Sequence, residues 1–251
     1  MEALKPPAGW LERVAALGVS FAPGEVERLG LYLALLLDAN ERMNLTAIRD
    51  AGEAWERHVF DALTLVPVLA DLPEGAEVAD VGTGGGIPGL VLACVMPRVR
   101  FTLVDATGKK CDFVRDAAAR MGLANVTVLH ARAERLGQDR GERTAAGRVG
   151  GHRGRYDAVV SRAVGRLASL AELTVPLAKV GGLIVLTKGQ KADEELAEAK
   201  QALHMLHTAH SGTVDTPTGR IVVIEKLRDT PKAYPRGDGE PKRAPLGVGR
   251  A

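Results

Sequence analysis

One segment limits what this chain can fold into more than any other: Asp80-Val-Gly-Thr-Gly-Gly-Gly-Ile-Pro-Gly89. The apolar run over residues 77–81 predicts a strand before the glycines. Pro88 predicts a helix after them, since proline is favoured at the first helical position. Glycines permit positive φ and let a ligand approach the backbone without meeting a Cβ, and the amide groups of a helix N-terminus suit the polar end of a nucleotide-like ligand. The segment therefore predicts a strand–loop–helix cradle for such a ligand.

Strand and helix patterns alternate along the rest of the chain. Strands are expected over residues 77–81, 100–104, 126–130, 156–161, 182–187, 211–215 and 220–226, and helices over 88–96, 109–122, 166–178 and 192–207. This alternation predicts a mostly parallel sheet with helices on both faces. The turn Thr216-Pro-Thr-Gly219 is short enough for an antiparallel hairpin. We expect an α/β, Rossmann-like fold with a seven-stranded, mostly parallel sheet whose last strand is antiparallel.

The 251 residues divide into three expected regions. Residues 1–72 have helical patterns, including a helix over 52–69 that Pro67 bends or ends, residues 73–228 form the α/β domain, and residues 229–251 form a basic tail. No apolar stretch matches a signal peptide or a membrane span, which favours a cytoplasmic protein without membrane contact. The two cysteines, Cys94 and Cys111, are isolated, so neither a disulfide nor a metal site is expected.

The glycine motif alone leaves two ligands open, because Gly84-Gly-Gly86-Ile-Pro-Gly89 also matches the dinucleotide pattern of an NAD-type oxidoreductase. Asp80 favours the other ligand, S-adenosylmethionine: its carboxylate can meet the ammonium group of the methionine part and would repel a diphosphate. Asp105, at the end of the second strand, can accept both ribose hydroxyls of either ligand. The expected terminal hairpin is typical of the methyltransferase sheet. A Walker-type phosphate loop is excluded by the missing Gly-Lys-Ser/Thr.

The segment after the fourth strand bears on the methyl acceptor. Enzymes that methylate an exocyclic amine carry Asn/Asp-Pro-Pro-aromatic there, whereas this chain has Ser161-Arg162-Ala163. No Pro-Cys or Thr-Cys element offers a nucleophile for methylation of pyrimidine carbon. The acceptor is therefore expected to need neither deprotonation nor covalent attack, which describes an aromatic ring nitrogen with an in-plane lone pair. Catalysis then reduces to orienting two reactants, an effect worth roughly 7–11 kcal/mol.

From about residue 40 to its C-terminus the chain resembles a known family. The motifs that carry the resemblance, in order, are Asn44-Leu-Thr46, Arg57-His58, Asp61, the glycine loop with Pro88-Gly89, Asp105, Lys109-Lys110, Arg132-Ala-Glu134, Ser161-Arg162-Ala163, Lys188-Gly189, Pro231-Lys-Ala-Tyr-Pro-Arg236 and Pro241…Pro245-Leu246. The series is similar to bacterial ribosomal RNA small subunit methyltransferase G, also called glucose-inhibited division protein B. The long Arg/Gly-rich stretch at Gly137–Arg155 departs from the family, since many relatives are shorter there.

The resemblance implies a Rossmann-like class I methyltransferase domain with a small helical N-terminal part. It also implies methylation of guanine N7 in the decoding-region loop of 16S rRNA, at position 527 in ribosomal numbering, with 16S rRNA or the small ribosomal subunit as partner. By position, Gly82 and Ile87 would line the donor site beside the loop glycines Gly84 and Gly86; Asp105, Ala106 and Thr107 would hold the ribose side; Ala133 and Glu134 would flank the adenine. Arg162 would stand between donor and acceptor and is the candidate catalytic residue.

Six further residues are candidates for contact with the RNA: Asn44, Arg57, His58, Lys188, Tyr234 and Arg236. Three of them have a plainer alternative. Asn44 could be a helix cap, His58 a hydrogen-bonded histidine between helices, and Lys188 a solvated lysine at a strand end. Tyr234 and Arg162 are the candidates to stack on the target base, since stacking needs an aromatic ring or a guanidinium plane.

Two basic segments, Gly137–Arg155 and the tail, bury too little apolar surface to fold alone. Their cations are Arg140, Arg143, Arg148, Arg153, Arg155, Lys232, Arg236, Lys242, Arg243 and Arg250. Such clusters favour contact with RNA phosphates over mere solvation. A non-catalytic RNA-binding module with a relic cradle therefore stays open beside the two enzymes.

Overall fold

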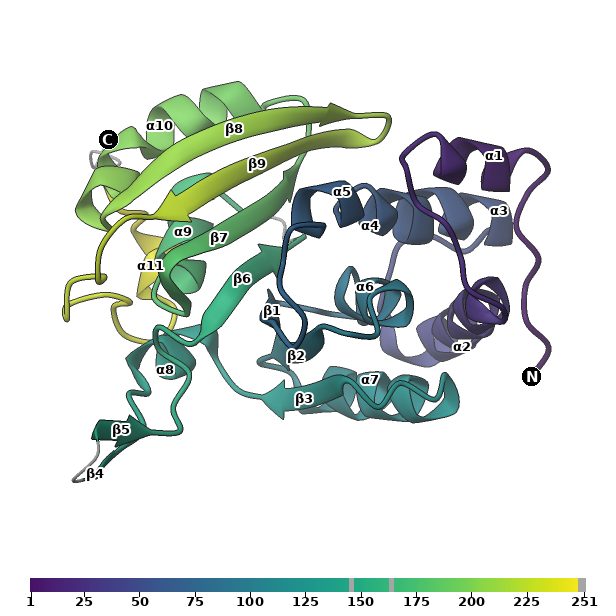
Figure 1. Cartoon of the computed structure of the whole chain (residues 1–251), viewed down its shortest axis with the longest axis horizontal. Coiled ribbons are helices and arrows are strands. Elements are labelled where there is room, and N and C mark those ends of the chain that lie inside the picture. The colour runs from purple at the N-terminus through teal and green to yellow at the C-terminus, as the bar shows by residue number, and fades with distance from the viewer. Residues whose placement is uncertain (145–146, 163–164, 248–251) are drawn as a thin grey trace. The chain divides into compact units, whose positions relative to one another are not determined.

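The computed structural model describes residues 1–144, 147–162 and 165–247, and of residues 144–148 it describes no side chain. Ala163 and Arg250, both used above, lie outside the described residues. The chain divides into two compact units (Figure 1). The first comprises Met1–Ala76 and Thr83–His130, and the second comprises Glu77–Gly82 and Ala131–Ala251.

The first unit begins with helices. They are α1 (Trp10–Ala15), α2 (Glu25–Met43), α3 (Ala51–Ala54), a π-helical turn (Trp55–Phe60), α4 (Asp61–Leu63) and α5 (Val66–Leu69). The single helix expected over residues 52–69 is thus a series of short pieces. Pro67 does not bend or end a long helix: it lies in the first turn of α5, where its missing N–H is not needed.

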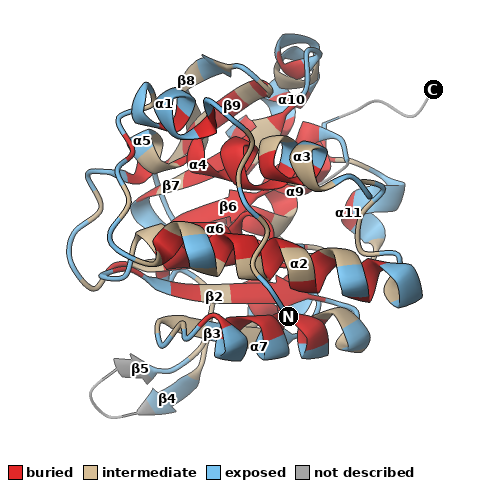
Figure 2. Ribbon diagram, turned by 90° about the vertical axis from the view of Figure 1, so that its right-hand side faces the viewer, coloured by how far each residue is buried: buried red, intermediate tan, exposed pale blue. Residues whose placement is uncertain are grey.

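Helix α2 supplies much of the apolar core of the first unit. Its buried residues include Leu29, Tyr32, Leu33 and Leu36, which recur every three or four positions and therefore share one face (Figure 2). This helix contacts α6 (Gly89–Val95) and α7 (Gly108–Arg120). The strands β2 (Arg100–Asp105) and β3 (Val126–His130) pair in parallel, in a register that places Asp105 opposite His130.

The second unit holds most of the sheet. Its strands are β1 (Glu77–Val81), β6 (Tyr156–Ser161), β7 (Ala178–Lys188), β8 (Thr208–Thr216) and β9 (Gly219–Lys226). β1, β6 and β7 are parallel, whereas β9 is antiparallel to both β7 and β8. The full seven-strand order is β3-β2-β1-β6-β7-β9-β8. The expected sheet, with its last strand reversed, is confirmed, and so is the hairpin over Thr216–Gly219, where Thr216 Oγ1 accepts the N–H of Gly219 at 3.0 Å.

Helices α9 (Leu167–Thr174) and α10 (Ala192–Met205) contact each other; α9 contacts β6 and β7, and α10 contacts β8. Helix α9 is shorter than the expected 166–178, because Pro176 has no N–H to continue it and β7 starts at Ala178. In the described part of the chain, no helix combines the length and the apolar character needed to cross a bilayer.

Both basic segments are more ordered than the sequence indicates. The first contains the end of helix α8 (Ala133–Gln138) and a hairpin of β4 (Glu142–Thr144) and β5 (Gly147–Val149). The tail as far as residue 247 folds back within the second unit, carries α11 (Glu240–Arg243) against α9, and buries Thr230, Pro241 and Leu246. The tail is thus ordered by contacts with residues distant in the sequence, and the expectation that it buries too little apolar surface to fold alone stays a prediction.

Candidate active site

The glycine segment forms a tight loop before α6 in the first unit. The N–H of Thr83 donates to the Val104 carbonyl at 3.0 Å, and the N–H groups of Gly86 and Ile87 both donate to the Thr83 carbonyl, at 2.8 and 3.0 Å. The N–H of Leu90 donates to Gly86 at 2.8 Å. The amides of Gly86, Ile87 and Leu90 are satisfied inside the loop and α6. They are therefore not the free helix-start donors that the sequence suggests.

Two positions in this loop leave little room for a side chain. Gly86 has φ +95°, and a Cβ there would lie 2.5 Å from Leu90 Cδ1. At Gly85 a Cβ would lie 2.8 Å from Leu36 Cδ1. The Gly85 carbonyl also accepts a hydrogen bond from the Tyr32 hydroxyl at 2.8 Å. Helix α2 thus packs directly against the loop and fixes its backbone.

Asp105 ties the end of β2 to this loop. Its Oδ2 accepts the N–H of Gly84 at 3.0 Å, and its Oδ1 accepts the N–H of Thr107, which precedes α7, at 2.8 Å. The carbonyl of Ala106 lies 3.2 Å from His130 Nε2. A carboxylate has about four acceptor sites, so these two bonds leave capacity for ribose hydroxyls. The role of Asp105 toward a ribose stays a prediction.

In the second unit, Asp80 and Gly82 lie at the carboxyl end of β1. Asp80 is 0% exposed and pairs in register with Val160 of β6. Gly82 has φ +75°, and no atom lies within 4 Å of the place where a Cβ would stand. A buried carboxylate beside a left-handed glycine with open space fits the amino-acid end of S-adenosylmethionine, since a small cationic group can approach both.

Ser161 ends β6 and Arg162 follows it, at the same edge of the second unit. The Ser161 hydroxyl donates to the Val81 carbonyl at 2.8 Å, and Arg162 is half-buried. The register of β6 with β7, where Ser161 lies opposite Leu186, brings Lys188 to this edge as well. Asp80, Arg162 and Lys188 therefore lie at the same edge of the sheet in this unit.

Lys188 is neither solvated nor exposed to RNA. Its side chain is 4% exposed; its Nζ pairs with Glu195 Oε2 at 2.6 Å and donates to the Gly165 carbonyl at 2.6 Å. Glu195 also accepts the N–H of Leu167, at the start of α9. This arrangement favours a positioning role: Lys188 and Glu195 hold the chain that leaves β6. Sequence reasoning missed Glu195, because an acid in the first turn of a helix gives no sign of its distant partner.

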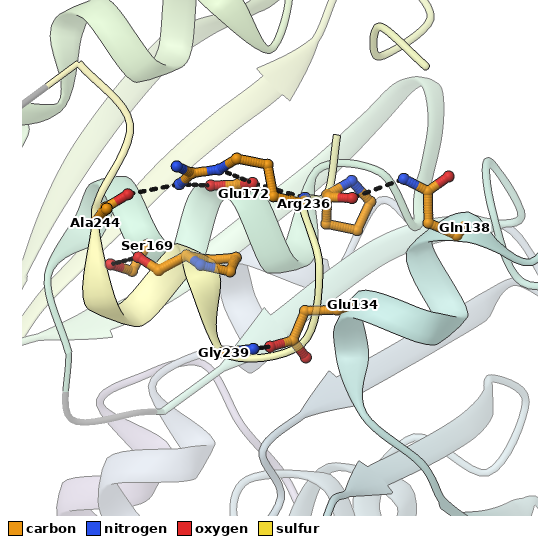
Figure 3. Close-up of polar contacts among 9 residues, drawn as sticks. Glu134, Gln138, Ser169, Glu172, Arg236, Gly239 and Ala244 are labelled. Atoms are coloured by element: carbon orange, nitrogen blue, oxygen red, sulfur yellow. Dashed lines mark hydrogen bonds and ion pairs between the residues drawn. The ribbon is translucent and has the colours of Figure 1, made fainter. Parts of the chain in front are cut away.

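Glu134 lies in the first turn of α8, directly after Ala133, and both residues are buried. Its Oε1 accepts the N–H of Gly239 at 2.8 Å, a contact with the tail that the sequence does not suggest (Figure 3). This hydrogen bond occupies one acceptor site of the Glu134 carboxylate. The expected contact of its other acceptor sites with an adenine stays a prediction.

The three N-terminal candidates lie in the first unit and differ in exposure. Asn44 is the C-cap of α2 in a left-handed conformation, with φ +49°. His58 is buried and its Nε2 lies 2.9 Å from the hydroxyl of Thr46. Both observations favour the structural alternatives, a helix cap and a hydrogen-bonded histidine. Arg57 is exposed and remains a candidate for RNA contact.

Arg236 is paired with a fully buried carboxylate, Glu172 (Figure 3). Its Nε and Nη2 donate to Glu172 Oε1 and Oε2 at 2.8 and 2.6 Å, and its backbone N–H donates to Oε1 at 2.8 Å. The pairing raises the pKa of Arg236, through the hydrogen bond to Glu172 first. Tyr234 is half-buried, and its carbonyl accepts a bond from Arg153. These contacts assign Arg236 to the architecture of the tail, a role that the basic cluster concealed.

Neither cysteine is set up as a nucleophile. Cys94 and Cys111 are buried, and burial raises the pKa of both thiols. Both therefore stay protonated near neutral pH, and thiolate is the nucleophilic form. Among the described residues, no group of three or more His, Cys, Asp or Glu side chains could hold a metal ion.

Comparison with known proteins agrees with this geometry. Residues 25–221 match the family model described as rRNA small subunit methyltransferase G. A protein of that name from Sorangium cellulosum is 49% identical over 92% of this chain and 92% of its own length. A putative S-adenosylmethionine-dependent methyltransferase from Methanococcus maripaludis superposes with a TM-score of 0.54 at 12% identity, covering 80% of this chain and 94% of that one.

A second solved structure, an S-adenosylmethionine-dependent methyltransferase from Aquifex aeolicus, has a TM-score of 0.51 at 17% identity and covers 70% of this chain and 93% of that one. At such identities the two structures establish the fold, while the sequence matches establish the family. The NAD-type oxidoreductase, left open by the glycine motif, is thereby set aside. The chain belongs to the rRNA small subunit methyltransferase G family.

Proposed function

We propose that this chain transfers a methyl group from S-adenosylmethionine to N7 of a guanine in 16S rRNA, at position 527 in ribosomal numbering. Family membership supports the reaction class and the ribosomal RNA substrate. The observation that carries the donor is the pairing of a fully buried carboxylate, Asp80, with the open left-handed position of Gly82 at the end of β1. With such a substrate, the protein is proposed to act in the cytoplasm on 16S rRNA or the small subunit.

The donor supplies a methyl group bound to a positively charged sulfur, so the C–S bond breaks as the C–N7 bond forms. Asp80 would bind the ammonium group, because a buried carboxylate gains most from a cationic partner. Gly82 would allow close approach, Asp105 would accept the ribose hydroxyls, and Glu134 would hold the adenine side.

The acceptor needs no base from the protein, because guanine N7 attacks with an in-plane lone pair and no proton leaves. The site agrees with this requirement. Ser161, the hydroxyl nearest the end of β6, is committed to the Val81 carbonyl, and the cysteine thiols are protonated. The work of the chain is then orientation, which can be worth roughly 7–11 kcal/mol. Arg162 is proposed to stand between donor and acceptor, with its guanidinium or the ring of Tyr234 stacked on the base.

The test combines purified protein, methyl-labelled donor and small ribosomal subunits, with the product mapped by strand cleavage at N7-methylguanine. One labelled guanine is expected, and Arg162→Ala is expected to lose turnover while Lys200→Met, an exposed change on α10, keeps it. Label elsewhere in the RNA would refute the acceptor. Absence of any label would favour the non-catalytic RNA-binding module. Full turnover by Arg162→Ala would remove Arg162 from the mechanism and leave the reaction class intact.

A further inference from the structure

A cavity of about 680 Å³ lies in the second unit, away from the edge that carries Asp80 and Arg162. Its lining includes Glu77, which starts β1, Lys226, which ends the antiparallel strand β9, and Arg155, which precedes β6. All three mark the amino-terminal edge of the parallel strands. The cavity is therefore at the opposite end of these strands from the proposed reaction.

The lining is basic. It contains five cationic side chains against two carboxylates: Arg140, Arg153, Arg155, Lys226 and Lys232 against Glu77 and Asp229. One carboxylate is already neutralised, since Arg155 binds Glu77 in a bidentate pair at 2.6 and 3.1 Å. The two basic segments identified in the sequence thus both line one cavity, the first with Arg140 and the tail with Lys232.

Two of these cations are bound to carbonyl oxygens instead of carboxylates. Lys226 is 2% exposed, and its Nζ donates to the carbonyl of Ala178 at 2.6 Å. Arg153 uses both terminal nitrogens on carbonyls, including those of Gly137 at 2.5 Å and Thr230 at 2.7 Å. Within the described residues, neither side chain forms an ion pair with a carboxylate. Two neighbouring cations that share one nearby carboxylate, Asp229, favour a further anion between them and the solvent.

The electrostatic strain at Lys226 agrees with this reading. Burial first, and then the charge of Arg153, lower the pKa of Lys226 to about 8, and Asp229 opposes them only in part. Thr230 adds a second observation: the residue lines the cavity and is 5% exposed, and its buried Oγ1 has no hydrogen-bond partner among the described residues. Buried hydroxyls are normally hydrogen-bonded, so this one is a donor without an acceptor.

We propose that the cavity lined by Lys226, Thr230, Arg140 and Lys232 binds a phosphate group of the RNA backbone. The assignment rests on the proposed function, which supplies the polyanion. The phosphate would pair with the buried Lys226 ammonium and accept a hydrogen bond from the Thr230 hydroxyl, and half-buried Arg140 and exposed Lys232 would supply further positive charge. Charge-assisted bonds of this kind are the strong ones. The reaction edge and this cavity would then hold one RNA at two separate points.

The test measures binding of 16S rRNA transcript, without donor, at several potassium chloride concentrations. Lys226→Met is expected to weaken binding on the order of ten-fold, the effect of losing one hydrogen bond to a charged group. The slope of log K against log salt should become shallower by about one. Thr230→Val should weaken binding less and leave the slope unchanged. Affinity for S-adenosylhomocysteine should be unchanged in both variants.

Lys200→Met is the matched control, because Lys200 is exposed on α10 and outside the cavity. RNA affinities of both cavity variants equal to that of this control would overturn the proposal. If Lys226→Met does not fold, Lys232→Gln, a change of an exposed residue in the cavity lining, provides the test. An unaltered slope of log K against log salt in this variant would also overturn the proposal.

A second arm distinguishes RNA from a small anion. Inorganic phosphate at matched ionic strength is added during thermal unfolding of the wild type and of Lys226→Met. Stabilisation of the wild type alone, together with unaltered RNA affinity, would assign the cavity to free phosphate and refute the RNA assignment. RNA binding is measured without methyl transfer. Absence of enzymatic activity would therefore refute the proposed function, while the RNA affinities of the cavity variants could still be interpreted.

Discussion

Replacing Arg236 by methionine separates the two roles that the sequence and the structure assign to this residue. The change leaves the Glu172 carboxylate, 0% exposed, without its cationic partner. Removing one member of a buried ion pair typically costs about 3–5 kcal/mol, because the remaining charge is uncompensated. The loss should approach this range, since Arg236 supplies both bonds to the two carboxylate oxygens.

The reverse change is expected to cost less. Glu172→Gln removes the charge but keeps an oxygen that can accept from Arg236, whose side chain is 25% exposed and also donates to the Ala244 carbonyl at 2.6 Å. We expect about 1–3 kcal/mol for this variant. The double variant Glu172→Gln/Arg236→Met carries no buried charge and should be more stable than Arg236→Met alone. A double-mutant cycle then measures the pairing directly.

Urea unfolding followed by circular dichroism gives the free energies, and binding of 16S rRNA by the folded variants gives the second readout. A loss of 3 kcal/mol corresponds to a midpoint lower by about 1 M urea when the slope is near 3 kcal/mol/M. RNA affinity should not change. Arg243→Gln, an exposed tail variant, is the control and should alter stability by less than about 0.5 kcal/mol. If Arg236→Met costs under 1 kcal/mol and weakens RNA binding, the structural role assigned to Arg236 is wrong.

Three other changes test the donor loop, the donor carboxylate and the buried lysine. Gly86→Ala should lower stability by about 1–3 kcal/mol and weaken binding of S-adenosylhomocysteine in calorimetric titration, because its Cβ would meet Leu90 at 2.5 Å. Gly189→Ala, where a Cβ has open space, should do neither. Asp80→Asn should fold and bind S-adenosylhomocysteine at least ten-fold more weakly; equal affinity would refute the ammonium contact. Lys226 has a folded pKa of about 8, below its usual value near 10.4, so the unfolded chain binds more protons between these values. Stability should therefore rise with pH across this window, by at most about 3 kcal/mol, and the rise should be absent from Lys226→Met.

The sheet and the glycine loop could be predicted because their signals are local. The strands at residues 77–81, 126–130 and 156–161 agree with the expected ranges to the residue, since each is a short apolar run bounded by polar or glycine residues. The loop needs glycine for reasons present in its own backbone, such as the positive φ of Gly82 and Gly86.

The tail could not be predicted, because its contacts join residues far apart in the sequence. Glu172 and Arg236 are 64 positions apart, and neither sits in a pattern that indicates the other. The same holds for Glu134 and the N–H of Gly239. The sequence gives the charge of a residue but not its partner. Lys188 and His58 were therefore candidates for RNA contact, although both are buried and hydrogen-bonded within the protein.

The cations of the two basic segments divide by partner and not by their place in the sequence. Arg153, Arg155 and Arg236 are bound to carbonyls or carboxylates of the second unit, whereas Arg143, Lys232, Lys242 and Arg243 are exposed. An exposed cation can reach a phosphate at little cost, but Arg236 would first have to leave Glu172 uncompensated. We therefore propose RNA contact for the exposed set and for Lys226. That lysine ends the apolar strand β9 and belongs to neither basic segment, so its proposed part in binding follows from its burial beside Arg153, which the single carboxylate of Asp229 offsets only in part.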